Sequence, residues 1–472
     1  MNGNLFELLR THWAVALDRQ FLVPTDGSPI TYREMDHRSA QFAAVLRAHS
    51  VTPGERVVVQ IEKSVDNVAI YLAVLRIGAI YVPLNTSYTD AEVAYFVEDA
   101  APALVIDQNN IEELSVAADS AEPSMQVEAR LADDLAAMVY TSGTTGRSKG
   151  AMLTHANLTS NALSLHAIWR FAPGDVLLHI LPIYHVHGLF VALHTAMLNA
   201  STVLFSTTFT VDETLDRLPE ATVMMGVPTH YVRLLDDVRF TRKLCSNMRL
   251  FTSGSAPMTT TVHENFAGRT GHHILERYGM SECGMLTSNP YEGDRIPGTV
   301  GYPLPAVRVR VMANGSECSP GDVGVVQVQG PNVFAGYWRL PEKTEEEHDG
   351  NWFITGDVGS LDHEGRLSLE GRAGDMIISG GLNIYPREIE LALDACEGVK
   401  ESAVVGRPDN DFGEQVVAFI VPSGKQRPDP DMLLEQLRQC LASFKLPKSI
   451  EFLPALPRNS MGKVQKVDLR QQ

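Results

Sequence analysis

The residues from 140 to 150 have the composition of a phosphate-binding loop. They read Tyr-Thr-Ser-Gly-Thr-Thr-Gly-Arg-Ser-Lys-Gly and follow the apolar run Leu135–Val139. Hydroxyl groups, glycine backbone N–H groups and a lysine are the donors that a polyphosphate requires. The pattern is not a Walker A loop, because Lys149 is followed by Gly150 and not by serine or threonine. A flexible surface linker is the alternative, but such a linker rarely follows a buried strand directly.

The segments on either side of this loop predict an α/β architecture. Asp66–Gly78 is expected to be a helix that begins with an aspartate cap and ends at glycine, Ala79–Pro83 a buried strand, and Asp90–Glu98 the next helix. Similar helix–strand units recur at Leu177–Phe205 and Ala221–Leu235. Helices that alternate with short apolar strands are typical of α/β sheets.

The pattern changes twice towards the C-terminus. Valines alternate with polar residues across Val307–Gly330, which predicts antiparallel strands. The last part indicates strand, helix, strand and helix in alternation over 376–378, 386–393, 402–405, 415–421 and 430–441, before a basic tail. We therefore expect a large N-terminal domain of α/β sheets plus a β-rich subdomain (residues 1–373), and a small mobile α+β C-terminal domain (residues 374–472).

Length, charge and cysteine usage limit the possible classes. A chain of 472 residues exceeds one hydrophobic core, which favours at least two domains. The net charge of −18 argues against a nucleic-acid binder and against a surface held on anionic lipid. The five cysteines form no CxxC pair, and the N-terminus lacks an apolar secretory core. The longest apolar stretch is interrupted by Arg76. These features favour a cytoplasmic enzyme with no membrane segment.

The whole ordered set of motifs resembles the adenylate-forming superfamily, which includes acyl-CoA synthetases, adenylation domains and luciferases. The motifs that carry the resemblance, in chain order, are YTSGTTGRSKGAMLTHANL from Tyr140, LPIYH ending at His185, SGSAP from Ser253, YGMSE from Tyr278 to Glu282, TGD ending at Asp357, Gly371-Arg372, Gly380-Gly381, and PRNSMGK ending at Lys463. One departure is Ser281, which stands where the family usually has threonine.

The resemblance implies an enzyme that adenylates a carboxylic acid with ATP. Lys463 would be the catalytic lysine that bridges the carboxylate and the α-phosphate, His185 would lie beside the carboxylate, and Glu282 with Thr145 would hold Mg²⁺. Tyr278 would stack on adenine. The residues expected to bind ATP are Thr141, Ser142, Gly143, Thr144, Thr145, Gly146, Lys149, Ser255, Ala256, Tyr278, Gly279, Ser281, Asp357, Arg372 and Lys463. Asp357 would accept hydrogen bonds from both ribose hydroxyls, assisted by Arg372.

The resemblance also implies how one pocket performs two reactions. Family members rotate the C-terminal domain after adenylation, which exchanges the lysine loop for a glycine-rich strand that admits the thiol. Gly380 and Gly381 match that strand, and Gly374 stands at the hinge position, where the family usually has aspartate or lysine. Glycine can absorb a large change in backbone angles. No carrier domain follows Lys466, so free coenzyme A is the expected thiol.

Further segments resemble malonyl-CoA synthetases. They are ERYGM from Glu276, the stretch from Thr287 to Pro305, WRF from Trp169, LPIYHVHG from Leu181 and GVPTHYVR from Gly226. The second carboxylate of malonate stays charged and needs a partner. Arg233, one helical turn after Thr229, is expected to pair with it, with His187, Ser255 and Met280 in the same pocket. An exposed helix arginine is the alternative. Cys283–Gly284 departs from the expected pattern and leaves the acid open.

Four other functions remain as alternatives. A CoA ligase for a short or medium fatty acid or an aryl acid would use the same motifs. A P-loop kinase or ATPase would release ADP instead of AMP, and lacks support because there is no Walker A pattern. A non-catalytic adenylate-binding protein would be expected to lose Lys463, Glu282 or Asp357, all of which are present. A luciferase-type monooxygenase shares the adenylation step.

Overall fold

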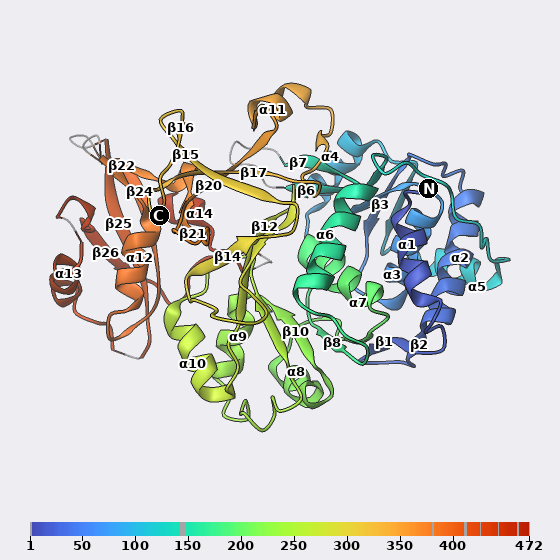
Figure 1. Cartoon of the computed structure of the whole chain (residues 1–472), viewed down its shortest axis with the longest axis horizontal. Coiled ribbons are helices and arrows are strands. Elements are labelled where there is room, and N and C mark those ends of the chain that lie inside the picture. The colour runs from blue at the N-terminus through green and yellow to red at the C-terminus, as the bar shows by residue number, and fades with distance from the viewer. Residues whose placement is uncertain are drawn as a thin grey trace.

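The computed structural model describes residues 2–141, 148–379, 382–409, 413–424, 426–441, 443–459 and 462–471. Figure 1 shows an elongated molecule with the first helices at one end and the last strands and helices at the other. Its described strands form three sheets. The mixed α/β character, the large N-terminal part and the small C-terminal part agree with the sequence prediction.

A six-stranded sheet carries the phosphate-loop motif. Its strands, in spatial order, are β18 (Gly336–Tyr337), β7 (Lys149–Thr154), β6 (Leu135–Thr141), β4 (Ile80–Pro83), β3 (Arg56–Gln60) and β5 (Leu104–Asp107). Strands β3, β4, β5 and β6 are parallel, whereas β7 returns antiparallel to β6 with Thr141 opposite Lys149. The two ends of the glycine-rich segment are therefore neighbours.

The largest sheet, with fifteen strands in the described part of the chain, changes character along its length. Its parallel part holds β1 (Gln20–Pro24), β9 (Thr202–Phe205), β8 (Val176–His179), β10 (Val223–Gly226), β11 (Leu250–Ser253) and β12 (Leu275–Met280), with β2 (Ile30–Thr31) antiparallel at the edge. Its antiparallel part holds β13 (Gly284–Ser288), β14 (Thr299–Pro303), β21 (Leu367–Arg372), β20 (Trp352–Leu361), β19 (His348–Asp349), β17 (Gly324–Gln329), β15 (Arg308–Ala313) and β16 (Ser316–Glu317). The antiparallel strands expected within 307–330 are confirmed.

Helices surround these sheets. Their bounds are α1 (Leu5–Trp13), α2 (Tyr32–Ala48), α3 (Val65–Arg76), α4 (Asp90–Ala100), α5 (Ile111–Ser120), α6 (His155–Ile168), α7 (His194–Leu198), α8 (Val211–Arg217), α9 (Pro228–Leu235), α10 (Thr260–Thr270) and α11 (Pro341–Glu346), with a π-helix η1 (His187–Leu193) and a 3₁₀ turn η2 (Leu218–Glu220). Helix α3 begins two residues earlier than expected. Ser64, not Asp66, is its cap, because the Ser64 hydroxyl accepts from the Asn67 N–H. Asp66 instead pairs with Arg38 at 2.9 Å.

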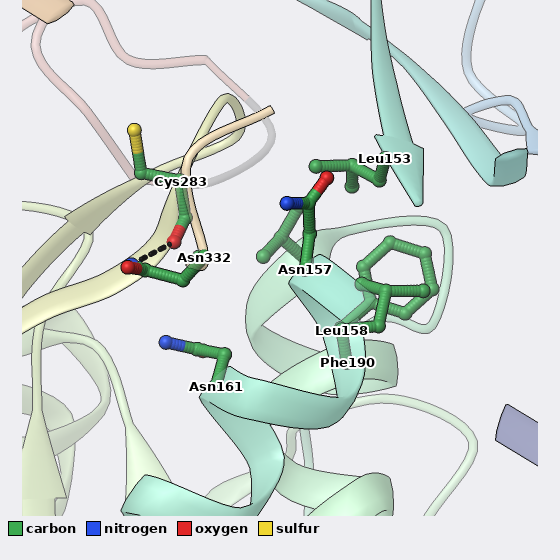
Figure 2. A pocket seen from close by; sticks show the side chains of 9 residues that line it. Leu153, Asn157, Leu158, Asn161, Phe190, Cys283 and Asn332 are labelled. Atoms are coloured by element: carbon green, nitrogen blue, oxygen red, sulfur yellow. Dashed lines mark hydrogen bonds between the residues drawn. The ribbon is translucent and has the colours of Figure 1, made fainter. Parts of the chain in front are cut away.

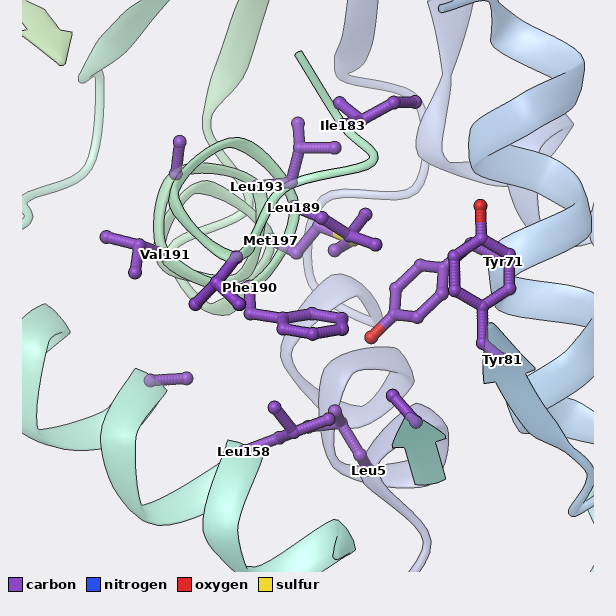
Figure 3. Close-up of a cluster of buried hydrophobic side chains, with 14 of the residues drawn as sticks. Leu5, Tyr71, Tyr81, Leu158, Ile183, Leu189, Phe190, Val191, Leu193 and Met197 are labelled. Carbon is purple, nitrogen blue, oxygen red and sulfur yellow. The ribbon is translucent and has the colours of Figure 1, made fainter. Parts of the chain in front are cut away.

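The main hydrophobic core lies where α1, α3, α6 and η1 meet. Figure 3 shows Leu189 and Phe190 of η1 near Tyr71 of α3 and Leu158 of α6. The Tyr71 hydroxyl hydrogen-bonds to His194 Nε2 at 2.6 Å, which satisfies a polar group inside this core. A π-helix between two well-packed helices is an uncommon local structure that often marks a functional site. This one starts at His187, one of the predicted substrate residues.

The C-terminal part has its own five-stranded sheet and core. The sheet holds β22 (Ile377–Ser379), β23 (Leu382–Ile384), β24 (Val399–Asp409), β25 (Gly413–Pro422) and β26 (Ser449–Phe452), accompanied by α12 (Pro386–Asp394), α13 (Pro430–Arg438), η4 (Ser443–Lys445) and α14 (Lys466–Gln471). Strict alternation of strand and helix fails at 415–421, which forms β25 directly paired with β24. The change from the large sheet to this one falls between Arg372 and Ile377, across the short turn η3 (Ala373–Asp375). The predicted boundary at residue 374 lies in that turn and stays a prediction.

None of the helices in the described ranges is long and apolar enough to cross a bilayer. All five cysteines carry free thiols.

Candidate active site

Thr141, at the start of the loop motif, lies beside the carboxylate of Glu282. Residues 142–147, which include the predicted ligands Ser142, Gly143, Thr144, Thr145 and Gly146, lie outside the described residues. Thr141 ends β6 and donates a hydrogen bond to Glu282 Oε1 at 3.2 Å. Lys149 begins β7, and its ammonium lies 2.8 Å from Glu347 and over the ring of Tyr337. The described end of the loop therefore meets Glu282 directly.

Glu282 is buried, and the side chains of the described residues that bond it, Thr141 and Tyr337, are neutral. Tyr337 also donates to its Oε1, at 3.1 Å. Burial is the main reason why its pKa is raised, since desolvation disfavours a charged carboxylate. A carboxylate with hydroxyls around it suits a hard divalent cation that takes its remaining ligands from phosphate oxygens and water. The donor set of Glu282 and Thr141 fits Mg²⁺; Thr145 lies outside the described residues.

The turn after Glu282 explains the departure at Cys283–Gly284. Figure 2 shows Asn332 Nδ2 donating to the Cys283 carbonyl, at 2.7 Å, beside a small pocket that Asn161 also lines. Asn161 bonds both the N–H and the carbonyl of Met285, at 3.1 and 2.7 Å. Gly284 has φ +60°, and a Cβ there would lie 2.6 Å from Asn161 Oδ1. Only glycine fits this close approach, so the turn that presents Glu282 is held by two buried amides.

A chain of mutually bonded polar groups forms the predicted nucleotide side. The hydroxyl of Tyr278, on β12, donates to Asp357 of β20, and Arg372 of β21 pairs with the same carboxylate at 2.8 Å. Arg372 also donates to the Thr355 carbonyl at 2.9 Å. Burial, and then the charge of Asp357, raise the pKa of Tyr278 well above its ordinary value. The structure thus brings together three residues that the sequence places 79 and 15 positions apart.

Lys463 lies on a short loop of the C-terminal part that reaches the large domain. Its N–H donates to Asn459 Oδ1 and its carbonyl accepts from the Asn459 N–H, both at 2.9 Å. A Cβ added to Gly462 would lie 3.0 Å from Thr229 Oγ1 at the start of α9. The ammonium keeps contact with solvent, while desolvation by the surrounding walls, and then Arg372, lower its pKa. The charges of Arg372 and Asp357, on strands of the large domain, thus act on Lys463 from across the domain boundary.

The predicted acyl side lies around the start of the π-helix. His185 precedes η1, His187 begins it, and Ser255 Oγ lies 3.4 Å from His187 Nδ1. Ser255 follows β11 in the left-handed region, with φ +70°, an uncommon strain for serine that marks functional turns. Burial, then the nearby Arg277, lower the pKa of His185 to about 4 and that of His187 well below its usual range. Both imidazoles are therefore neutral at pH 7.

The remaining predicted site residues lie on a helix, in turns and at a strand end. Arg233 is exposed on α9, where its charge lowers the pKa of the neighbouring His230. Ala256 and Ser281 are half-buried in the turns after β11 and β12, and Gly279 and Met280 end β12. Gly380 and Gly381 lie outside the described residues.

Sequence reasoning missed Arg277. This arginine lies in the middle of the buried strand β12, directly before Tyr278, and only 3% of its surface is exposed. The signal was an arginine within a strand, Leu275–Met280, whose residues the sequence analysis used only as part of a longer resemblance. A buried cation in a strand needs a partner or a purpose.

The fold and the site define a class: a two-part nucleotide-dependent enzyme whose lysine loop meets the site from a separate C-terminal domain. The sequence matches the AMP-binding enzyme family over residues 9–338 and the C-terminal domain of AMP-binding enzymes over residues 388–463. The protein belongs to this AMP-binding enzyme family.

Three relatives illustrate the range of similarity. ATP-bound MatB from Rhodopseudomonas palustris is 46% identical, with a TM-score of 0.96 over 100% of this chain and 99% of its own; the apo structure of the same protein gives 0.87. The malonate–CoA ligase of Arabidopsis thaliana is 31% identical over 99% of this chain and 89% of its own. A feruloyl-CoA synthase of Amycolatopsis is 34% identical over 94% of each chain.

Proposed function

We propose that this protein is an ATP-dependent, AMP-forming acid–thiol ligase that joins malonate to coenzyme A. The observation that carries the proposal is the convergence of Lys463, Glu282 and the Tyr278–Asp357–Arg372 chain where the two domains meet. These groups match in type the needs of a reaction that brings two anions together, a carboxylate and a triphosphate.

In the first half-reaction a carboxylate oxygen forms a bond to the α-phosphorus of ATP, and the bond from that phosphorus to pyrophosphate breaks. Lys463 would neutralise charge on both anions as they meet. Asp357 would accept from the ribose hydroxyls, and Arg372 would hold that carboxylate ionised and oriented. Tyr278, fixed by its bond to Asp357, would present its ring to adenine. The higher similarity to the ATP-bound relative than to its apo form supports a domain arrangement suited to this step.

The remaining nucleotide contacts complete the first half-reaction. The loop residues Ser142 to Gly146, with Thr141 and Lys149, would surround the β- and γ-phosphates, and Ser255, Ala256, Gly279 and Ser281 would line the nucleotide. Glu282, with Thr145, would hold Mg²⁺, which when bound neutralises charge on the phosphate oxygens. Lys149 would exchange its present partner Glu347 for phosphate.

In the second half-reaction the thiol sulfur of coenzyme A forms a bond to the acyl carbon, and AMP leaves with the electrons of the acyl–oxygen bond. We propose that the domain of residues 374–472 rotates about Gly374 to expose the strand of Gly380 and Gly381 to the thiol. A Cβ on Gly374 would meet no other atom within 4 Å, which supports a turn free of side-chain packing. Arg470 bonds the Gly374 carbonyl at 3.3 Å and Asp375 at 3.0 Å, contacts within the C-terminal domain that tie its first residues to its last helix.

Malonate is the acid that the relatives favour, with methylmalonate as a close variant. His185 would lie beside the reacting carboxylate, and Arg233, His187, Ser255 and Met280 would form the acyl pocket. An aryl acid is the second candidate substrate, because one relative is a feruloyl-CoA synthase. A non-catalytic adenylate-binding protein is the third candidate. The presence of Lys463, Glu282 and Asp357 argues against it. Five free thiols support a reducing compartment such as the cytoplasm.

A substrate screen tests this proposal. The purified protein is mixed with ATP, Mg²⁺ and coenzyme A, and with acetate, malonate, methylmalonate, succinate, octanoate or 4-coumarate in turn, and AMP and thioester are measured. We expect AMP and thioester in equal amounts, with malonate the best acid. A preference for octanoate or 4-coumarate would replace malonate and leave the ligase chemistry standing. The absence of AMP with every acid would contradict the enzyme itself.

A further inference from the structure

Lys63 and His179 form a buried pair that the proposed mechanism does not use. Lys63 lies in the loop between β3 and α3, and His179 ends β8, so the pair joins the six-stranded sheet to the largest sheet. The Lys63 ammonium lies 2.8 Å from His179 Nδ1 and 2.9 Å from the His179 carbonyl oxygen. It also lies 4.4 Å from the centre of the ring of Phe205, at the end of β9. The ammonium thus meets an imidazole, a carbonyl and an aromatic face.

The second ring nitrogen of His179 holds a backbone carbonyl. His179 Nε2 lies 2.9 Å from the carbonyl oxygen of Gly188, the second residue of the π-helix η1. Because a carbonyl can only accept, Nε2 carries the imidazole proton, and Nδ1 accepts from Lys63. Burial, and then the charge of Lys63, lower the pKa of His179 well below its ordinary value, which keeps the ring neutral. The hydrogen bonds therefore run in one direction, from Lys63 through His179 to Gly188.

Gly188 closes the turn that carries both histidines of the acyl side. A Cβ on Gly188 would lie 2.0 Å from the carbonyl oxygen of Pro182, so only glycine allows the two ends of this turn to meet. His185 and His187 lie between them. A side chain that enters the hydrogen-bond ladder of a helix is a recognised cause of irregularity, and the irregular helix η1 begins at His187. The buried pair therefore acts on the backbone beside a predicted substrate residue.

Packing alone does not account for this pair. An ammonium and an imidazole lose their hydration when they are buried, and desolvation lowers the pKa of Lys63 well below its ordinary value. Two apolar side chains of similar size would fill the space without this cost. They would not, however, donate a directed hydrogen bond to the Gly188 carbonyl. The polar pair therefore supplies a fixed orientation of the chain at the start of η1.

We infer that Lys63 and His179 are positioning residues for the acid, which act through the π-helix. This inference rests on the proposed function. Lys63 fixes the orientation of His179, which in turn holds the Gly188 carbonyl. Gly188 places its neighbour His187 beside Ser255, whose Oγ lies 3.4 Å from His187 Nδ1. A displacement of this turn by about 1 Å would move the predicted acid-binding groups and leave the nucleotide side in place.

Three variants of the pair and one control test the inference. Lys63→Met removes the donor at similar length, His179→Phe removes both hydrogen bonds and keeps a ring, and His179→Gln keeps one acceptor and one donor. Arg249→Met is the matched control, because Arg249 is a half-buried cation that pairs with Asp175 at 2.6 Å outside the site. For each variant, kcat and KM are measured by ATP–pyrophosphate exchange, once with malonate varied and once with ATP varied. Thermal unfolding checks that the variants are folded.

We expect the acid and the nucleotide to respond differently. His179→Phe should raise KM for malonate by about thirtyfold and Lys63→Met by about tenfold, whereas KM for ATP should change by about twofold or less in both. His179→Gln should lie between the wild type and His179→Phe. Arg249→Met should lower the unfolding temperature and change neither KM, as a merely structural cation does. If His179→Phe does not fold, the difference between the two KM values in Lys63→Met decides.

Two results would overturn the inference. Unchanged KM values in folded variants of the pair, or equal rises for the acid and for ATP, would make Lys63 and His179 a packing element only, while exchange by the wild type would support the proposed function. Absence of exchange by the wild type with every acid of the substrate screen would contradict the proposed function, and the inference with it. If the screen ranks another acid above malonate, that acid replaces malonate in the assay and the same difference is expected.

Discussion

The nucleotide side and the acyl side of the site are built on opposite principles. On the nucleotide side Tyr278, Asp357 and Arg372 satisfy one another before any ligand arrives. On the acyl side Arg277 and His187 have buried polar atoms without a hydrogen-bond partner in the part of the chain that the structure describes. Self-bonded groups are preorganised at little cost, whereas unsatisfied ones reserve their binding energy for a ligand. The difference indicates that the choice of acid, more than the choice of nucleotide, is set by unpaired charge.

The largest effect is expected at the point where the two sides meet. Lys463→Ala should abolish acyl-adenylate formation, by about a thousandfold or more, because one cation balances two anions in the transition state. Thioester formation from a supplied acyl-adenylate should be largely spared. ATP–pyrophosphate exchange and thioester synthesis measure the two steps separately. Unimpaired exchange in the variant would contradict the role of Lys463, and acetylation of Lys463 should act as the alanine does, since it removes the charge.

A second, smaller effect distinguishes the nucleotide side, where Arg372 is paired with Asp357, from the acyl side, where Arg277 is not paired with a carboxylate of the described residues. Arg372→Met leaves Asp357 buried without its cation, so both the affinity for ATP and the stability should fall. We expect KM for ATP to rise by about tenfold and the free energy of unfolding to decrease by about 1–2 kcal/mol, given the partial exposure of Arg372. Arg277→Met, in contrast, removes an uncompensated charge and should not lower stability. Urea unfolding of the two variants makes the comparison; equal destabilisation would contradict it.

The smallest effect concerns pH. The folded state lowers the pKa of His185 to about 4, whereas an unfolded histidine titrates near 6.5. The unfolded state therefore binds the proton first, so stability present above pH 6.5 is lost as the pH falls towards 4. His185→Gln should remove about 1–2 kcal/mol of this loss between pH 7 and pH 5, measured by urea unfolding at both values. The same pH dependence in variant and wild type would mean that His185 is not held neutral.

Much of the nucleotide side could be predicted from the sequence, because its residues belong to short motifs. Glu282, Asp357, Arg372 and Lys463 were identified in this way, and the structure places them around one region. The acyl side could be predicted less well. Arg233 has helical spacing but is exposed. The local signal of Arg277 is only its place within a strand; that its Nε and Nη2 have no hydrogen-bond partner among the described residues depends on segments distant in sequence.

The fold, like the site, could be predicted from the sequence only where the pattern is local. The helix near Asp66 and the strand to Pro83 follow from local pattern, and both are confirmed. The predicted cap of that helix is wrong by two residues, because Ser64 and Asp66 can both cap a helix and Arg38, from a different helix, pairs with the aspartate. The run 415–421 is apolar on both faces, so its period did not distinguish strand from helix. Antiparallel pairing with β24 along its whole length makes this run a strand.

One measurement tests the central claim, that the acyl side is built for a second negative charge. ATP–pyrophosphate exchange by the wild-type protein is compared with malonate and with the monomethyl ester of malonic acid. The ester keeps the reacting carboxylate and the carbon chain and replaces the second carboxylate with a neutral methyl ester. We predict a kcat/KM for malonate about thirtyfold or more above that for the ester. Equal values, or a preference for the ester, would contradict the account.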